Sequence, residues 1–145
     1  MKIKNVVVIG SGTMGSGIAA HLCNANIPVT LLDLKTEISE KARDRIYKSR
    51  PPLLLDRSKI NNIKVGNIDD NFDVVKDADW VVEAVVERID IKHQIYEKIF
   101  KARKEGAIVS SNTSSIPIKV LSEHLTDKEK KDFCITHFFN PVRYM

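Results

Sequence analysis

The fold is decided by the stretch Val6–Gly15, which reads VVVIGSGTMG. Four apolar residues run directly into three glycines spaced as G-x-G-x-x-G, a pattern typical of a buried strand, a tight turn and a helix. Such a turn leaves room for a pyrophosphate beside the N-terminus of the helix. Asp33 closes the next apolar run, where a dinucleotide site places the acid that binds the adenosine ribose. The stretch therefore predicts a dinucleotide site in an α/β fold; the alternative is the same turn without a ligand.

The acid at the end of the second strand indicates which dinucleotide is bound. A carboxylate at Asp33 accepts hydrogen bonds from both ribose hydroxyls and repels a 2′-phosphate, which favours NAD over NADP. Lys35 nearby weakens that preference slightly, and the alternative role for Asp33 is to cap the following helix. The residues expected to contact NAD in this part of the chain are Gly10, Ser11, Gly12, Thr13, Met14, Gly15 and Asp33.

Size and composition are those of one ordinary globular domain: 145 residues, 43% hydrophobic and 29% charged. We expect residues 1–145 to form a single NAD-binding domain. The net charge of +4 is spread among nearly as many acids as bases, which indicates a solvated surface rather than a nucleic-acid face. No apolar run approaches the roughly 20 residues that cross a bilayer, and the first strand starts too early to leave room for a leader peptide. A cytoplasmic protein is expected, with neither nucleic acid nor membrane as partner; the alternative is a mature organelle protein whose leader has been removed.

The cysteines and three of the histidines carry no signal of a metal site. Cys23 and Cys134 lack the spacing of a disulfide framework or a Cys/His metal cluster, so they are expected to be reduced core residues. His21, His93 and His124 fall on predicted helices and are expected to be surface or packing residues. We therefore predict no metal site.

Predicted strands alternate with predicted helices along the chain. Strands are expected at residues 2–9, 29–34, 60–66, 80–86, 107–110 and 133–138, and helices at residues 14–25, 35–49, 89–103 and 116–124, with a further helical turn from the capping box at Thr126. This alternation predicts a doubly wound, mostly parallel Rossmann sheet. The leucines at 53–55 have no clear period; they pack either within the domain or on something outside the chain.

Polar residues gather where the later strands end, which is where a doubly wound sheet binds its ligands. Glu83 lies inside an apolar run and is costly there unless it is paired or unless the strand has already left the core. Glu87 is suited either to contact the ribose or nicotinamide side of a cofactor or to stabilise a helix N-terminus. Residues 111–115, SNTSS, either orient a substrate or cofactor group or cap the next helix. His137 has the titration range for proton transfer, the alternative being a structural histidine.

Taken together, residues 10–17, 83–87, 111–115 and 137–141 resemble the L-3-hydroxyacyl-CoA dehydrogenase family. The resemblance implies that His137 takes the proton from the substrate's 3-hydroxyl while hydride passes to NAD, and that Ser114 hydrogen-bonds the substrate oxygen. It further implies cofactor contacts for Glu87, Lys92 and Asn112 and a substrate contact for Asn140. Only the resemblance identifies the substrate as an acyl-CoA. The sequence looks most like the dehydrogenase part of larger bacterial hydratase/dehydrogenase chains.

The resemblance also implies what the 145 residues lack. In the family the histidine is paired with a glutamate about a dozen residues later, and a C-terminal helical domain provides dimer contacts and much of the acyl pocket. This sequence stops before both, so we expect the fragment to bind NAD with little or no turnover and the whole enzyme to be a homo-oligomer through the missing region. The alternatives are a related hydroxyacid or sugar-acid dehydrogenase, such as an L-gulonate dehydrogenase, or a nucleotide-binding module without chemistry.

Overall fold

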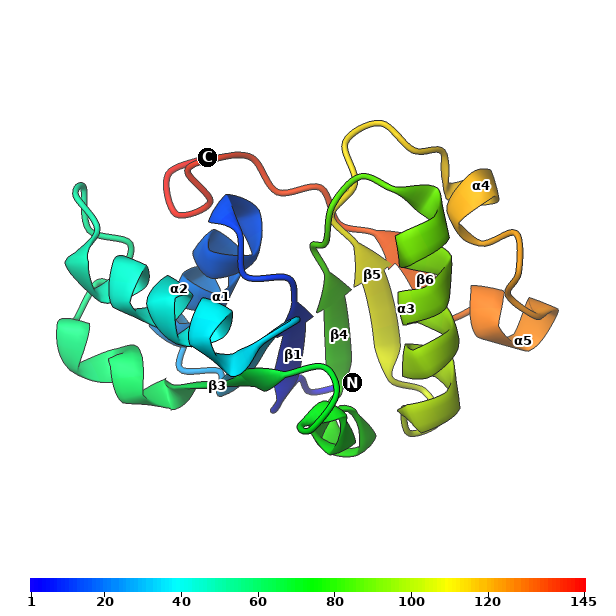
Figure 1. Ribbon diagram of the computed structural model, residues 1–145, viewed down its shortest axis with the longest axis horizontal. Coiled ribbons are helices and arrows are strands. Elements are labelled where there is room, and N and C mark those ends of the chain that lie inside the picture. The colour runs from blue at the N-terminus through cyan, green and yellow to red at the C-terminus, as the bar shows by residue number, and fades with distance from the viewer.

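A six-stranded, wholly parallel sheet with the order β3-β2-β1-β4-β5-β6 forms the centre of the molecule in the computed structural model, which describes all 145 residues (Figure 1). The strands are β1 (Val6–Ile9), β2 (Val29–Asp33), β3 (Ile63–Asn67), β4 (Trp80–Glu83), β5 (Ile108–Ser111) and β6 (Phe133–Ile135). The chain order reverses between β1 and β4, which are hydrogen-bonded neighbours in parallel register. The predicted doubly wound Rossmann sheet is therefore confirmed.

Helices cover both faces of the sheet. They are α1 (Thr13–Asn24), α2 (Thr36–Lys48), α3 (Ile89–Ala102), α4 (Ile118–Leu121) and α5 (Asp127–Lys130), with 3₁₀ turns η1 (Arg57–Asn62) and η2 (Phe72–Asp77). Alternate β1 residues point to opposite faces, so Val6 and Val8 join the core under α1 and α2 while Val7 and Ile9 join the core under α3. No helix combines the length and the apolar character needed to cross a membrane.

Two predicted strands begin later than expected because their first residues bond elsewhere. The backbone N–H groups of Lys4 and Asn5 donate to Oδ2 of Asp79 at 2.7 and 3.0 Å, so the first strand begins at Val6 rather than at residue 2. The third strand begins at Ile63 rather than at residue 60, because the preceding segment forms η1, capped by the carboxylate of Asp56. The other element boundaries differ from the prediction by a few residues, and the capping box at Thr126 is present.

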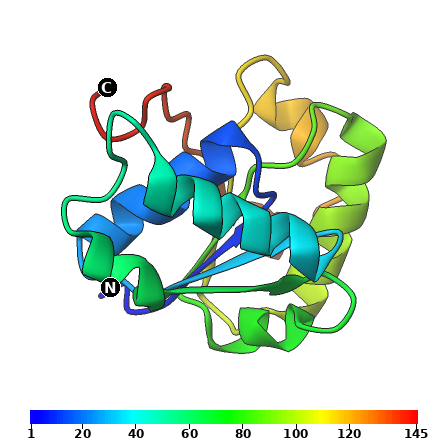
Figure 2. The ribbon, with the colours of Figure 1, turned by 60° about the vertical axis from the view of Figure 1, so that its left-hand side comes forward.

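The leucine stretch packs mainly within the domain. Leu54 is buried and Leu53 packs against the same core, whereas Leu55 is 65% exposed. The C-terminal segment returns to this loop (Figure 2): Nη1 of Arg143 and the hydroxyl of Tyr144 both donate to the Pro52 carbonyl, at 2.6 and 3.2 Å. Val142 is buried in the core beside α1. The segment after β6 is thus held against the domain at its C-terminal end.

Candidate active site

The glycine turn between β1 and α1 combines close packing with an open side. Gly10 has φ +99°, and a Cβ at Gly15 would lie 1.8 Å from the Gly10 carbonyl oxygen, so both positions require glycine. A Cβ at Gly12, the N-cap of α1, would meet no atom within 4 Å. This open face exposes the N-terminal N–H groups of a twelve-residue helix, which is the setting in which a pyrophosphate binds.

Asp33 faces the glycine turn from the end of β2. Its Oδ2 accepts from the backbone N–H and from the hydroxyl of Ser11, at 2.7 and 2.6 Å, and its Oδ1 accepts from the N–H of Leu34. The N-cap of α2 is Lys35, and no side chain caps that helix. Asp33 therefore fixes the glycine turn rather than the helix, and its predicted contact with the ribose stays a prediction.

Two hollows lie along the carboxyl edge of the sheet and share the wall formed by residues 84–86. One, of about 370 Å³, is lined by Gly10, Ser11, Gly12, Asp33, Leu34, Ile38, Arg45, Ile68, Ala84, Val85, Val86, Ile91 and Ile95. The other, of about 390 Å³, is lined by Met14, Ala84, Val85, Val86, Glu87, Lys92, Asn112, Ser114, His137, Phe138, Phe139 and Asn140. A shared wall at the reversal of strand order suits an extended two-part ligand such as a dinucleotide.

The second hollow brings together the polar residues predicted from strands five and six. His137 and Ser114 are both exposed and both line it, together with Asn140. The backbone N–H of Phe138 donates to Oδ1 of Asn112 at 2.9 Å, which fixes the loop after β6 to the loop after β5. The ring of His137 lies 4.6 Å from the ring of Phe139. Folding therefore places a candidate base and a candidate hydroxyl donor on one surface.

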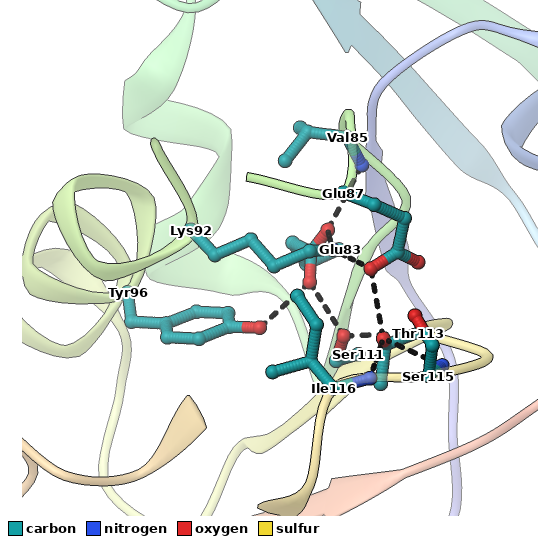
Figure 3. Close-up of polar contacts among 9 residues, drawn as sticks. All are labelled: Glu83, Val85, Glu87, Lys92, Tyr96, Ser111, Thr113, Ser115 and Ile116. Carbon is teal, nitrogen blue, oxygen red and sulfur yellow. Dashed lines mark hydrogen bonds and ion pairs between the residues drawn. The ribbon is translucent and has the colours of Figure 1, made fainter. Parts of the chain in front are cut away.

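A fully buried carboxylate underlies this surface (Figure 3). Glu83 at the end of β4 has no exposed area and accepts four hydrogen bonds. The donors are Lys92 Nζ at 2.6 Å, Tyr96 Oη at 2.7 Å, Ser111 Oγ at 2.6 Å and the Val85 N–H at 2.9 Å. These bonds offset the loss of solvation that makes a buried charge costly. Burial and the charge of Glu83 raise the pKa of the Tyr96 hydroxyl, which therefore remains a donor.

Glu87 extends the network towards the hollow. Its Oε2 accepts from Thr113 Oγ1 at 2.9 Å and lies 3.9 Å from the Lys92 ammonium. Thr113 Oγ1 in turn accepts from the N–H groups of Ser115 and Ile116 (Figure 3). Glu87 thus joins the loops after β4 and β5. The Lys92 side chain is only 1% exposed and its ammonium is bound to Glu83, so its predicted cofactor contact stays a prediction.

Sequence reasoning did not find the partners of Glu83, nor did it find a second cluster outside these hollows. His93 of α3 lies next to Glu123 and His124, which follow α4. The three residues come from two distant parts of the sequence, so no local spacing signals their proximity. Cys23 lies in the core as predicted, whereas Cys134 on β6 is only half-buried; both are free thiols.

Comparison with known proteins identifies the family of the chain. The family model described as "3-hydroxyacyl-CoA dehydrogenase, NAD binding domain" matches residues 5–145. A putative fatty acid oxidation complex trifunctional enzyme of Rickettsia felis is 46% identical over 99% of this chain and 21% of the relative. A probable 3-hydroxyacyl-CoA dehydrogenase of Deinococcus radiodurans is 42% identical over 100% of this chain and 44% of the relative.

The solved structures agree with the sequences. The crystal structure of 3-hydroxybutyryl-CoA dehydrogenase from Escherichia coli K12 has a TM-score of 0.86 at 27% identity, covering 100% of this chain and 31% of that one. The chain thus spans less than half the length of these relatives. With a matching family model over nearly all its residues and a turn that fits a dinucleotide, the chain belongs to the 3-hydroxyacyl-CoA dehydrogenase family, as its NAD-binding domain.

Proposed function

We propose that the chain is the cofactor-binding part of an enzyme that oxidises (S)-3-hydroxyacyl-CoA to 3-oxoacyl-CoA in fatty-acid β-oxidation. The observation that carries the proposal is the shared hollow in which His137 and Ser114 lie beside Met14 of the glycine turn and beside Glu87. An acyl-CoA substrate is supported by the names of the relatives, in which hydroxyacyl-CoA dehydrogenases and fatty acid oxidation enzymes recur.

The proposed roles divide between proton transfer and orientation. His137 takes the proton from the substrate's 3-hydroxyl, and in the reverse direction its imidazolium returns that proton to the oxygen. The Ser114 hydroxyl donates a hydrogen bond to the same oxygen, and Asn140 contacts the substrate at the rim of the hollow. NAD, when bound, accepts the hydride that leaves C3.

The proposed cofactor contacts follow the two hollows. The N–H groups of the glycine turn bind the pyrophosphate at the open face of Gly12, and Asp33 binds the adenosine ribose. The proposed contacts as a set are Gly10, Ser11, Gly12, Thr13, Met14, Gly15, Asp33, Glu87, Lys92 and Asn112. Homo-oligomer formation through residues beyond this chain, and a cytoplasmic location, remain predictions.

The test follows NADH absorbance with acetoacetyl-CoA, using the full-length protein. We expect His137→Gln to lower kcat by about 10²–10⁴-fold, the usual worth of a general acid–base, while the Kd for NADH stays unchanged. His21→Gln, at an exposed position on α1, is the matched control and should keep full activity.

Two results would contradict the proposal. Unchanged kcat in His137→Gln would remove the histidine from the mechanism. Faster reduction of free oxo acids than of acetoacetyl-CoA would instead favour a hydroxyacid or sugar-acid dehydrogenase with the same fold.

A further inference from the structure

We propose that His93, Glu123 and His124 form a binding site for a divalent first-row transition metal ion, with Zn²⁺ as the expected occupant. One ring nitrogen of each histidine and one carboxylate oxygen of Glu123 all lie within 4.8 Å of one another. The cluster sits where α3 runs beside α4 (Figure 1), and none of its members lines the two hollows assigned to the cofactor and substrate. It is therefore a separate site.

One ring nitrogen of His93 is already hydrogen-bonded within the protein, which leaves the other nitrogen for a metal ion. Its Nε2 lies 2.9 Å from the carbonyl oxygen of Val120. A carbonyl only accepts, so this nitrogen carries a proton, and Nδ1 is the ring nitrogen left to bind a metal ion. Metal-binding histidines usually donate their other N–H to a carbonyl or carboxylate in this way, which fixes the tautomer and the ring. The His124 ring meets the His93 ring edge to face, with centroids 4.4 Å apart.

The donor set selects the class of ion. Two imidazoles and one carboxylate suit Zn²⁺ and its first-row neighbours, whereas Mg²⁺ and Ca²⁺ prefer sites made of oxygen ligands. Ligand bonds of about 2.0–2.2 Å in a tetrahedral site put donor atoms about 3.4 Å apart. Since the three atoms lie within 4.8 Å of one another, each pair must close by at most about 1.4 Å. Glu123 and His124 are exposed and can rotate to do so, which leaves a fourth position for water.

The surroundings favour a cation. The cluster borders a hollow of about 410 Å³ whose rim carries the carboxylates of Glu97 and Glu129 and one ammonium, Lys101. Its floor is apolar and includes Leu121 and Leu125, both buried. His93 of α3 is bonded to the carbonyl of Val120 in α4, and a bound ion would in addition connect α3 to the segment between α4 and α5. Binding should therefore raise the melting temperature.

The test titrates Zn²⁺ into the metal-free, full-length protein by calorimetry, with the melting temperature and the Kd for NADH measured in parallel. We expect saturable binding in the wild type that weakens about tenfold or more in His93→Ala, His124→Ala and Glu123→Gln, as expected when a ligand is lost. His21→Ala, which removes an exposed histidine from α1, is the control and should bind Zn²⁺ as the wild type does.

Co²⁺ as a second probe reports directly on the ligands, since its visible spectrum depends on coordination. The spectrum should change in the His93, Glu123 and His124 variants and stay the same in His21→Ala. Absence of saturable Zn²⁺ binding, or equal affinity in the wild type and all three variants, would overturn the site. NADH binding should be the same in every variant. That measurement confirms folding and is independent of whether the proposed dehydrogenase activity is correct.

Discussion

At the scale of single residues, alanine at two glycines of one turn should affect different properties: NADH affinity at Gly12 and folding stability at Gly15. Gly12→Ala adds a methyl group where no atom lies within 4 Å, so we expect the free energy of unfolding to fall by less than about 1 kcal/mol, the small cost of alanine at an N-cap. The same methyl occupies the space through which a pyrophosphate approaches the N–H groups. The Kd for NADH should therefore rise about tenfold or more, as when one hydrogen bond to a charged group is lost.

Gly15→Ala is the matched comparison. Its methyl would lie 1.8 Å from a backbone oxygen, so the expected loss of stability is about 3 kcal/mol or more. Urea unfolding and NADH titration of both variants separate the two effects. Loss of NADH affinity from Gly15→Ala alone would mean that the open face of Gly12 is not the binding face.

The buried hydroxyl of Tyr96 gives a second prediction at this scale. Tyr96→Phe removes one of the four donors to the Glu83 carboxylate without leaving a cavity. Because that bond is to a buried charge, we expect a loss of about 1.5–3 kcal/mol in urea unfolding. Tyr47→Phe, at a ring 44% exposed, is the control and should change stability by less than about 0.5 kcal/mol. Equal effects in the two variants would contradict the network as a source of stability.

The residue scale also shows what the sequence reveals and what it conceals. Gly10, Gly12 and Gly15 could be assigned because a strand, a turn and a helix adjoin in the sequence. The sequence shows that Glu83 needs a hydrogen-bonding partner. It does not show which residues are its partners, because three of the donors come from α3 and β5. The cluster around His93 was missed for the same reason: tertiary packing alone brings its members together.

At the scale of elements, the carboxylate of Asp79 stabilises the edge of the sheet formed by the amino ends of β1 and β4. It accepts from Lys104 of the loop after α3 and from the N–H groups of Lys4 and Asn5 before β1. These bonds lower the pKa of Asp79 from 3.8 to about 2, and the bond from Lys104 has the largest effect. A lowered pKa stabilises the fold at pH values above about 4, and this contribution is lost as the pH falls towards 2.

Acid unfolding measures this contribution. Asp79→Asn should be less stable than the wild type at pH 7, and the difference should shrink as the pH falls from 4 to 2, followed by circular dichroism at a fixed urea concentration. Asp73→Asn, at a side chain 88% exposed, is the control for removing a charge. A difference that persists unchanged at pH 2 would mean that the Asp79 charge is not what stabilises this edge.

Elements were predicted better than their ends. The alternation of apolar runs with segments of helical period was enough to predict the six strands and their parallel arrangement, because a strand buried on both faces is a nearly continuous apolar run. Boundaries failed where a side chain captured the backbone, as Asp79 does before β1 and as Asp56 does at η1. Such captures depend on one or two backbone hydrogen bonds each and leave no periodic signal.

At the scale of the whole molecule, cofactor binding and turnover should be separable. The family resemblance implies a glutamate beyond residue 145 that orients the catalytic histidine, and within these residues the His137 ring packs on Phe139. We expect the 145-residue chain to bind NADH like the full-length protein but to reduce acetoacetyl-CoA about 10⁴-fold more slowly, by analogy with the orienting acid of a catalytic triad. Fluorescence titration and turnover, with circular dichroism to verify folding, test this; rapid turnover by the fragment would refute it.

Val142 packs against α1 at Gly17, where an added Cβ would lie 3.0 Å from its Cγ2 atom. The segment that carries His137 is therefore positioned partly by the lack of a side chain at Gly17 of α1. Homologues should record this as correlated substitution: alanine at position 17 should accompany a residue smaller than valine at position 142. The position of His137 would then depend partly on residue 17, which does not line the hollow that His137 lines.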